Sequence, residues 1–373
     1  MKRILALDGG GIGAFFTLQV LAKIEKIFRD ERKKDDLVLR DEFHMFAGTS
    51  VGALIATGLA WGMSVEQVKN LFDKNSNAMF AKAPLHLRWW EKYRSEPLAD
   101  LFRHHFCEDD TTRTPAKLGT RKLWVDGEPK YLLVVMRNAS TGSPWPLTNN
   151  PRAMFNNPEL GDNCNLQIPI WKLLRASTAA PTYFRPECID VDGKPHWFVD
   201  GGITPYNNPA LIAVLMATLP CYKIEWPTGA DKLMVVSVGT CRERIRYKQG
   251  VKRVGLLAHA EYVPMALLSS VSQEQDLVCR LLGDCRLGDP LDVELGDLVG
   301  TQPALLGCSE KKFTYIRYNY AVTDDDKKEL RKVTRKGFTL DNLKAIGWVK
   351  RLGKRYADTV DTTGTVKGEH LLR

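Results

Sequence analysis

The stretch FAGTSVGALIATG (residues 46–58) decides the fold, because a strand, a tight turn and a helix follow one another in it directly. The Ala- and Gly-rich residues 51–61 predict the helix. Gly48 and Gly52 flank Ser50 in the pattern G-x-S-x-G, and small residues at those two places allow a sharp turn that exposes the serine. The turn holds the hydroxyl at a helix N-terminus, where developing negative charge is stabilised. Ser50 is therefore the candidate nucleophile.

A second turn lies upstream, in the opening sequence MKRILALDGGGIGAFF. It separates a predicted strand at residues 4–7 from a predicted helix at residues 15–28. Backbone N–H groups at such a junction bind anions. Gly9, Gly10 and Gly11 could therefore hold either a cofactor phosphate or the oxyanion of a reacting ester.

The surroundings of this loop favour the oxyanion. Gly9, Gly11 and Ala14 do fit the dinucleotide pattern G-x-G-x-x-G/A. A dinucleotide site also needs an acidic residue about 20 positions further on, at the end of a second strand. That region is KIFRDERKKDD, a helix end and a charged loop, and Asp41 comes late. Asp8 would also lie close to a pyrophosphate. We expect an oxyanion loop and no cofactor.

The candidate base lies in HWFVDGGITPYNNPA (residues 196–210). Residues 197–199 predict a strand that runs into Asp200, Gly201 and Gly202. An aspartate at a strand end, followed by two small residues, can approach a second loop without steric obstruction. Taken on its own, the stretch is better interpreted as an ordinary Asp-Gly turn.

The rest of the chain alternates between strand and helix patterns, which predicts an α/β fold with a mostly parallel central sheet. Residues 142–167, rich in Asn, Pro and Gly, predict a long loop. We expect a catalytic core at residues 1–215, and residues 216–373 to complete the same domain. Further strands are predicted at residues 43–47, 131–136 and 233–238, and further helices at 168–176, at 324–336 and around 343–349, the last two packing over the sheet.

Composition is that of a globular protein, with 44% hydrophobic and 26% charged residues among 373. The net charge of +9 is uneven, because residues 311–373 hold 16 Lys and Arg against 8 Asp and Glu. This basic section suggests an anionic partner, although a solvated surface of mixed charge is the alternative. The eight cysteines show no metal-binding spacing, and the first apolar run is too short for a signal peptide. We expect a cytoplasmic protein without a metal.

Together these motifs resemble the patatin-like phospholipase family over residues 4–210. ILALDGGGIGA looks like its opening glycine motif, GTSVG its nucleophile elbow and DGG its aspartate motif. LLRASTAAPTYF is similar to a segment that many members carry between elbow and aspartate. One departure is that Gly13 and Ala14 stand where many members have a basic residue and then glycine. The basic side chain is therefore missing beside the expected oxyanion hole.

The resemblance implies a three-layer α/β/α fold and a Ser–Asp dyad that works without histidine. Ser50 would attack an ester carbonyl and Asp200 would take its proton. The N–H groups of Gly9, Gly10 and Gly11 would stabilise the oxyanion, and water would then release the acid. The implied activity is that of a phospholipase, a lipid acyl hydrolase acting on membrane glycerophospholipids.

Two other functions remain open on the sequence alone. An α/β-hydrolase would use a Ser–His–Asp triad, for which His259 in LLAHAEYV is the only good downstream histidine. The elbow comes early for that fold, and His259 also fits an ordinary helix. A non-enzymatic nucleotide-binding module would need Gly9 to Gly11 and be indifferent to Ser50.

The stretch LHLRWWEKYRSEPL alternates aromatic and basic residues. Trp89, Trp90 and Tyr93 could settle at the headgroup level of an anionic membrane, so peripheral action on the inner membrane is expected. The alternative is a helix that buries its tryptophans in the core.

Regulation rests on the resemblance. Some bacterial patatin-like proteins are effectors of anti-phage defence that a cyclic dinucleotide such as cyclic GMP-AMP switches on, and an uncontrolled phospholipase would be toxic. A cyclic dinucleotide is thus a candidate activator, with no nucleotide-binding residues assigned. Nucleic acid is not an expected partner, and an oligomer is left open. Asp8 and Arg175 are taken as structural.

Overall fold

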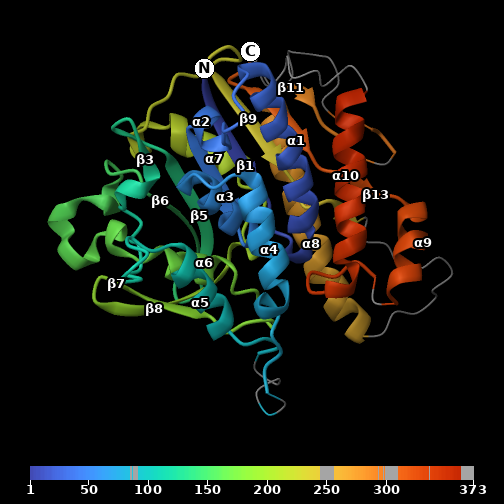
Figure 1. Ribbon diagram of the computed structural model, residues 1–373, viewed down its shortest axis with the longest axis horizontal. Coiled ribbons are helices and arrows are strands. Elements are labelled where there is room, and N and C mark those ends of the chain that lie inside the picture. The colour runs from blue at the N-terminus through green and yellow to red at the C-terminus, as the bar shows by residue number, and fades with distance from the viewer. Residues whose placement is uncertain are drawn as a thin grey trace.

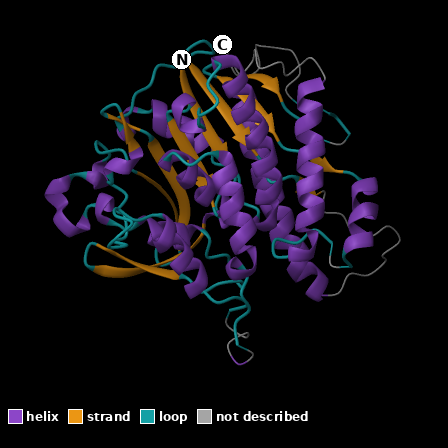
Figure 2. Cartoon of the chain, in the orientation of Figure 1, coloured by secondary structure: helices purple, strands orange, loops and turns teal. Residues whose placement is uncertain are grey.

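The computed structural model is a three-layer α/β/α structure (Figure 1). It describes residues 1–84, 86, 91–243, 256–292, 294–296, 298, 310–335 and 337–362. Strands form the middle layer and helices cover both of its faces (Figure 2). The expected fold class is confirmed. No helix within the described ranges combines the length and the apolar run that crossing a membrane requires.

The main sheet has nine strands among the described residues, in the order β11-β12-β9-β1-β2-β5-β8-β7, with β6 also on β5. The five pairings from β11 to β5 are parallel, and the pairings of β5 with β6, β5 with β8 and β7 with β8 are antiparallel. The strands are β1 (Lys2–Leu7), β2 (Met45–Thr49), β5 (Tyr131–Asn138), β6 (Ser143–Thr148), β7 (Glu187–Val191), β8 (Lys194–Asp200), β9 (Leu233–Val238), β11 (Asp284–Leu287) and β12 (Thr314–Tyr318).

Two short pairs of strands lie outside this sheet in the described part of the chain. They are β3 (Trp124–Val125) with β4 (Glu128–Pro129), and β10 (Arg242–Glu243) with β13 (Ala321–Val322).

The strands of the sheet bury both faces, as parallel strands do when helices cover each side. In β1, Leu5 and Leu7 join one hydrophobic core, while Ile4 and Ala6 join the other. The second core is closed by α7 (Ala210–Thr218) and α8 (Leu256–Leu282), which lie behind the sheet in Figure 1. The helices that contribute to the first core are α1 (Ala14–Arg32), α2 (Leu39–Glu42), α3 (Val51–Trp61), α4 (Val65–Met79), α5 (Glu96–His105), α6 (Ile170–Ser177), α9 (Asp324–Val333) and α10 (Ile346–Thr362).

The carboxyl ends of the parallel strands meet at one edge of the sheet, where ligands bind in open α/β folds. The glycine loop follows β1 there, and the Ser50 turn follows β2. Gly239 and Thr240 follow β9 at the same edge. Strands from both halves of the chain therefore support the candidate site.

Most predicted elements are confirmed, and residues 142–167 are the main error. This segment was expected to be a loop, but it contains β6 and three short 3₁₀ helices. Pro144 and Pro146 made a strand an unlikely prediction, because proline has no N–H group to donate to the hydrogen-bond ladder of a sheet. They are tolerated because β6 pairs with β5 along only one of its sides.

The two C-terminal helices differ from expectation in what they cover. Helix α10 packs along α1 instead of lying directly on the sheet, and the rings of Phe16 in α1 and Tyr356 in α10 have their centroids 5.3 Å apart. Helix α9 lies outside α10 (Figure 1) and is joined to it by an ion pair between Asp326 and Arg355. Helix α10 thus supports the outer side of α1, the helix that follows the glycine loop, and α9 packs on α10 in turn.

The α1–α10 contact depends on a helical glycine. A Cβ atom on Gly353 would lie 2.9 Å from the Cα atom of Phe16, whereas one on Gly347 in the same helix would have only the flexible end of Arg351, 3.7 Å away. Overpacking costs about 1–3 kcal/mol, more than the roughly 1 kcal/mol that alanine gains over glycine in a helix. We expect Gly353→Ala to lower the free energy of unfolding in urea and Gly347→Ala to leave it unchanged or raise it. The same sign for both would contradict this packing.

Candidate active site

Ser50 occupies a strained turn between β2 and α3. Its φ of 55° and ψ of −127° are rare for a residue with a side chain. A Cβ atom on Gly48 would lie 2.3 Å from the Gly52 carbonyl oxygen, and one on Gly52 would lie 2.3 Å from the Leu7 carbonyl oxygen. Both glycines are therefore sterically required, as the G-x-S-x-G pattern predicts.

The hydroxyl of Ser50 points directly at Asp200. Ser50 Oγ donates a 2.6 Å hydrogen bond to Asp200 Oδ2, and the Gly202 N–H donates to Asp200 Oδ1 at 2.7 Å. Asp200 is only 5% exposed, and this burial raises the pKa of its carboxyl to about 6, against the hydrogen bonds from Ser50 and Gly202. The candidate nucleophile and the candidate base are thus in direct hydrogen-bond contact.

The register of β5 explains how two residues 150 positions apart come together. Along one side β5 pairs with β6 from Leu133 to Asn138, so β2 and β8 must share its other side. Strand β2 ends on that side with Thr49 opposite Val135, and β8 begins its pairing at the next position, with Asp200 opposite Met136. The chain turns away from β5 at Ser50, and Asp200 therefore pairs with β5 at the position that β2 would have reached next.

Ser177, which the sequence did not single out, fixes the elbow. Its hydroxyl accepts the Ser50 N–H at 2.9 Å and donates to the Val135 carbonyl at 2.6 Å. It lies in the LLRASTAAPTYF segment, so the motif was visible although the role was not. Gly201 is equally constrained, since a Cβ there would lie 2.3 Å from the Val135 carbonyl oxygen.

The glycine loop presents fewer donors than its sequence suggests. The Gly9 N–H donates to the Asn207 carbonyl at 3.2 Å, so Gly9 is not available as an oxyanion donor in this arrangement. No described residue accepts a hydrogen bond from the N–H groups of Gly10 or Gly11. Gly11 has a φ of 55°, in the left-handed region that glycine adopts without strain. Gly10 and Gly11 remain as the candidate donors.

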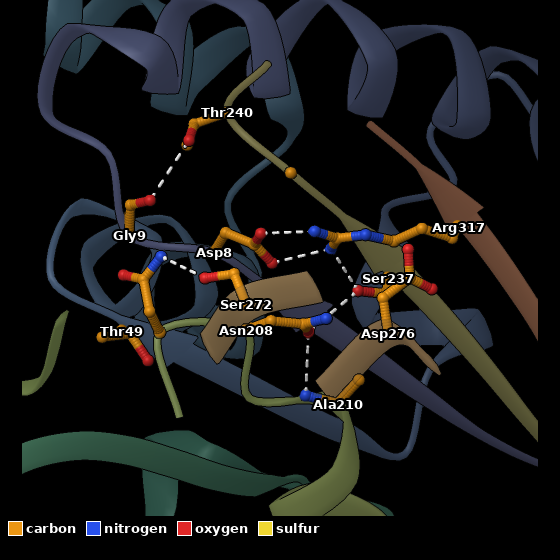
Figure 3. Close-up of polar contacts among 12 residues, drawn as sticks. Asp8, Gly9, Thr49, Asn208, Ala210, Ser237, Thr240, Ser272, Asp276 and Arg317 are labelled. Atoms are coloured by element: carbon orange, nitrogen blue, oxygen red, sulfur yellow. Dashed lines mark hydrogen bonds and ion pairs between the residues drawn. The ribbon is translucent and has the colours of Figure 1, made fainter. Parts of the chain in front are cut away.

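Thr240 fills the space beside Gly13, the position where the resemblance led us to expect a basic side chain. A Cβ on Gly13 would lie 2.5 Å from the Thr240 carbonyl oxygen, and one on Gly10 only 2.1 Å from Thr240 Oγ1. The Thr240 hydroxyl donates to the Gly9 carbonyl at 3.1 Å (Figure 3). The segment after β9 thus packs closely against the glycine loop and supports its backbone.

A buried ion pair anchors the base of the same loop. Both Asp8 and Arg317 are almost inaccessible, and two hydrogen bonds of 2.8 and 2.5 Å join them, as Figure 3 shows. Burial alone would lower the pKa of Arg317, but the Asp8 carboxylate raises it above its ordinary value. Arg317 also donates to Ser237 on β9 at 2.6 Å. The pair ties β1 to β9 and β12 directly beneath the glycines.

Further polar contacts hold the segment after Asp200 in place. Ser237 Oγ donates to Asn208 Oδ1 at 3.2 Å, and Asn208 Oδ1 also accepts the Ala210 N–H at the start of α7 (Figure 3). The Asn207 amide donates to Ser272 of α8 at 3.2 Å. Residues far apart in the sequence therefore set the position of the chain that holds the Gly9 N–H.

Among the remaining sequence candidates, those with described side chains take no part in the hydrogen bonds of this site. His259 lies in α8, as a helical residue, but its side chain is outside the described residues. Trp89 and Trp90 also lie outside them. Tyr93 favours the alternative of a buried aromatic stretch: it is 4% exposed and donates to Asp341 at 2.6 Å. Arg175 is buried, as expected, and donates to Ser95 and to the Arg185 carbonyl.

No cluster of three or more metal-binding side chains occurs in the described part of the chain. The groups that the structure places at the strand edge are a serine hydroxyl, a carboxylate and backbone N–H groups. This set suits transfer of an acyl group through a covalent serine ester.

Comparison with known proteins gives a consistent result. Residues 5–214 match the family described as patatin-like phospholipase. The chain is 31% identical over 254 residues to a cGAMP-activated phospholipase of Vibrio cholerae, covering 65% of this chain and 64% of that protein. It is 27% identical over 250 residues to a protein of the same name from Escherichia coli, covering 65% and 62%. The match thus spans less than two thirds of either bacterial protein.

A mammalian protein is also similar. The 85/88 kDa calcium-independent phospholipase A2 of Mus musculus is 29% identical over 221 residues, covering 57% of this chain and 23% of the mouse protein.

The raised pKa of Asp200 predicts a stability cost at neutral pH. Between its ordinary value of 3.8 and about 6 the native state binds more protons than the unfolded state, so stability falls as pH rises through this range. We expect Asp200→Asn to exceed the wild type in free energy of unfolding at pH 7.5 by about 1–3 kcal/mol. Urea denaturation at about pH 7.5 and about pH 4.5 measures this, and the difference should shrink at the lower pH. A pH-independent loss of stability would refute it.

The Asp8–Arg317 pair predicts a second stability effect. Arg317→Met leaves a buried carboxylate without its partner, which typically costs about 3–5 kcal/mol of unfolding free energy. Because the Asp8→Asn substitution removes that charge, the double variant Asp8→Asn/Arg317→Met should recover part of the loss in urea denaturation. If the double variant is no more stable than Arg317→Met alone, the two side chains are not coupled.

Proposed function

The chain belongs to the patatin-like phospholipase family, and we propose that it hydrolyses acyl esters of membrane glycerophospholipids with Ser50 as nucleophile and Asp200 as base. The observation that carries the proposal is the 2.6 Å hydrogen bond from Ser50 Oγ to the buried Asp200 carboxylate. The names of the bacterial and mouse relatives support the substrate class. No histidine is needed, because the carboxylate contacts the hydroxyl itself.

In the first step, Ser50 Oγ attacks the ester carbonyl carbon and its proton passes to Asp200 Oδ2. The carbonyl oxygen becomes an oxyanion, which the N–H groups of Gly10 and Gly11 and the N-terminus of α3 stabilise. The tetrahedral intermediate then collapses. The lysophospholipid alkoxide leaves with the proton from Asp200, and the acyl group stays on Ser50.

In the second step, Asp200 takes a proton from water, which attacks the acyl-Ser50 ester. The same N–H groups stabilise the second oxyanion. Its collapse releases the fatty acid and returns the proton to Ser50. Asp200 thus acts as base and acid in turn, and a carboxyl with a pKa of about 6 is suited to both roles near neutral pH.

A cyclic dinucleotide is the proposed activator, and anti-phage defence the proposed setting. Two bacterial relatives are named as cGAMP-activated phospholipases. We further propose peripheral action at the inner membrane, since the substrate is a bilayer lipid.

The dyad predicts activity that depends on both side chains and on pH. We expect Ser50→Ala and Asp200→Asn each to lower fatty-acid release from phospholipid vesicles by about 10³-fold or more, as in other nucleophile–base units. The wild-type rate should fall as pH drops below about 6, because the base becomes protonated. Release is measured with and without cyclic GMP-AMP, and circular dichroism controls for folding. Wild-type-like release by either variant would refute the dyad.

A further inference from the structure

A groove lies between the segment after α4 and the loop that joins α9 to α10. Its volume is about 570 Å³, within the range of roughly 300–1,000 Å³ that is usual for small-molecule sites. None of the site residues described above lines it, apart from the Tyr93–Asp341 contact. Its lining includes Phe80, Lys82, Tyr93, Arg335, Asp341 and Lys344.

The groove is rich in cations that no described residue neutralises. Lys82, Arg335 and Lys344 are exposed, and none of them forms an ion pair with any described side chain. The one carboxylate in the lining, Asp341, is already bound by Lys92 at 2.5 Å. An anionic ligand would therefore find several donors and little repulsion.

Leu340, the residue next to the groove residue Asp341, touches the glycine loop. The Leu340 carbonyl accepts the Ile12 N–H at 2.9 Å. A Cβ on Gly11 would lie 2.2 Å from the same oxygen, so the two loops are in close contact. Leu340 is the neighbour of Asp341, whose carboxylate holds Lys92 and the Tyr93 hydroxyl. Because Leu340 contacts Gly11 and Ile12 directly, a displacement of residues 340–341 would shift the backbone that carries the candidate oxyanion donors.

We propose that this groove binds a phosphodiester ligand of the cyclic dinucleotide class, and that its occupancy is transmitted through Leu340 to the N–H groups of Gly10 and Gly11. The inference rests on the proposed function, because it assigns the activator a place and a route to that same active site. A cyclic dinucleotide carries two phosphodiester charges, which Lys82, Arg335 and Lys344 match. Phe80, a half-buried lining residue, offers an apolar surface to a base.

Charge reversal at two groove residues tests the site. Binding of cyclic GMP-AMP to the full chain is measured by isothermal titration calorimetry for the wild type, Arg335→Glu and Lys344→Glu. Each reversal should weaken binding by about tenfold or more, because a contact between charged groups is replaced by repulsion. The matched control is Lys34→Glu, an exposed lysine beyond the far end of α1, about 28 Å along that helix from the glycine loop. It should bind with wild-type affinity.

Two further measurements test whether binding in the groove activates the enzyme and whether the groove binds a lipid headgroup instead. The cyclic GMP-AMP concentration that gives half-maximal fatty-acid release should rise by about tenfold in Lys344→Glu and return towards the wild-type value in Lys344→Arg. Sedimentation with phosphatidylglycerol vesicles tests the other source of a phosphodiester, a lipid headgroup. If both reversals lose vesicle binding but keep nucleotide affinity, the cyclic dinucleotide assignment is overturned.

Failure of this inference differs from failure of the proposed function. Unchanged nucleotide affinity in both reversals, or no binding by the wild type, overturns the groove assignment while Ser50-dependent release can persist. Ser50→Ala should bind cyclic GMP-AMP like the wild type, because it removes only the nucleophile. Binding that is lost in the reversals and retained in Ser50→Ala and Lys34→Glu supports the site.

Discussion

The succession of two strands along one side of β5 is the constraint on which the candidate site depends. Strand β2 leaves that side after Thr49, and β8 arrives from the opposite direction with Asp200 at the next position. The hydrogen-bond ladder thus sets the Ser50–Asp200 distance, because each residue lies at the end of a strand that cannot shift without losing its pairing. Ser177 and Gly201, both in contact with the Val135 carbonyl, fix the remaining freedom of the two turns.

Two features that cost folding free energy lie at the candidate site. Ser50 has a strained backbone, and Asp200 is a carboxylate buried away from water. The surrounding structure compensates with interactions that come from distant parts of the chain. The Asp8–Arg317 pair joins β1 to β12 under the glycine loop, and α10 supports α1 from outside. The last third of the chain therefore stabilises a loop near its beginning, and through Leu340 it is also in a position to alter that loop.

The sequence predicts the local parts of this structure well. The strand before the glycine loop, the helix at 51–61 and the strand at 233–238 agree with the structure, because each has a strong periodicity and a clear turn signal. Contacts between distant residues could not be predicted in this way. Nothing local marks Ser177, Asn207 or Arg317 as supports of the site, and β6 was missed because Pro144 and Pro146 normally argue against a strand. The glycine motif led us to expect the Gly9 N–H as an oxyanion donor, but this group already donates to the Asn207 carbonyl.

The reactivity of Ser50 is the most direct measure of whether this geometry makes a nucleophile. A lipid-like fluorophosphonate attaches only to an activated serine, and intact-protein and peptide mass spectrometry identify the site and the rate of attachment. One adduct should form on Ser50 of the wild type, and Asp200→Asn should form it at least about 100-fold more slowly, because the proton has no acceptor. An adduct on another serine, or equal rates in the two proteins, would contradict the pairing of Ser50 with Asp200.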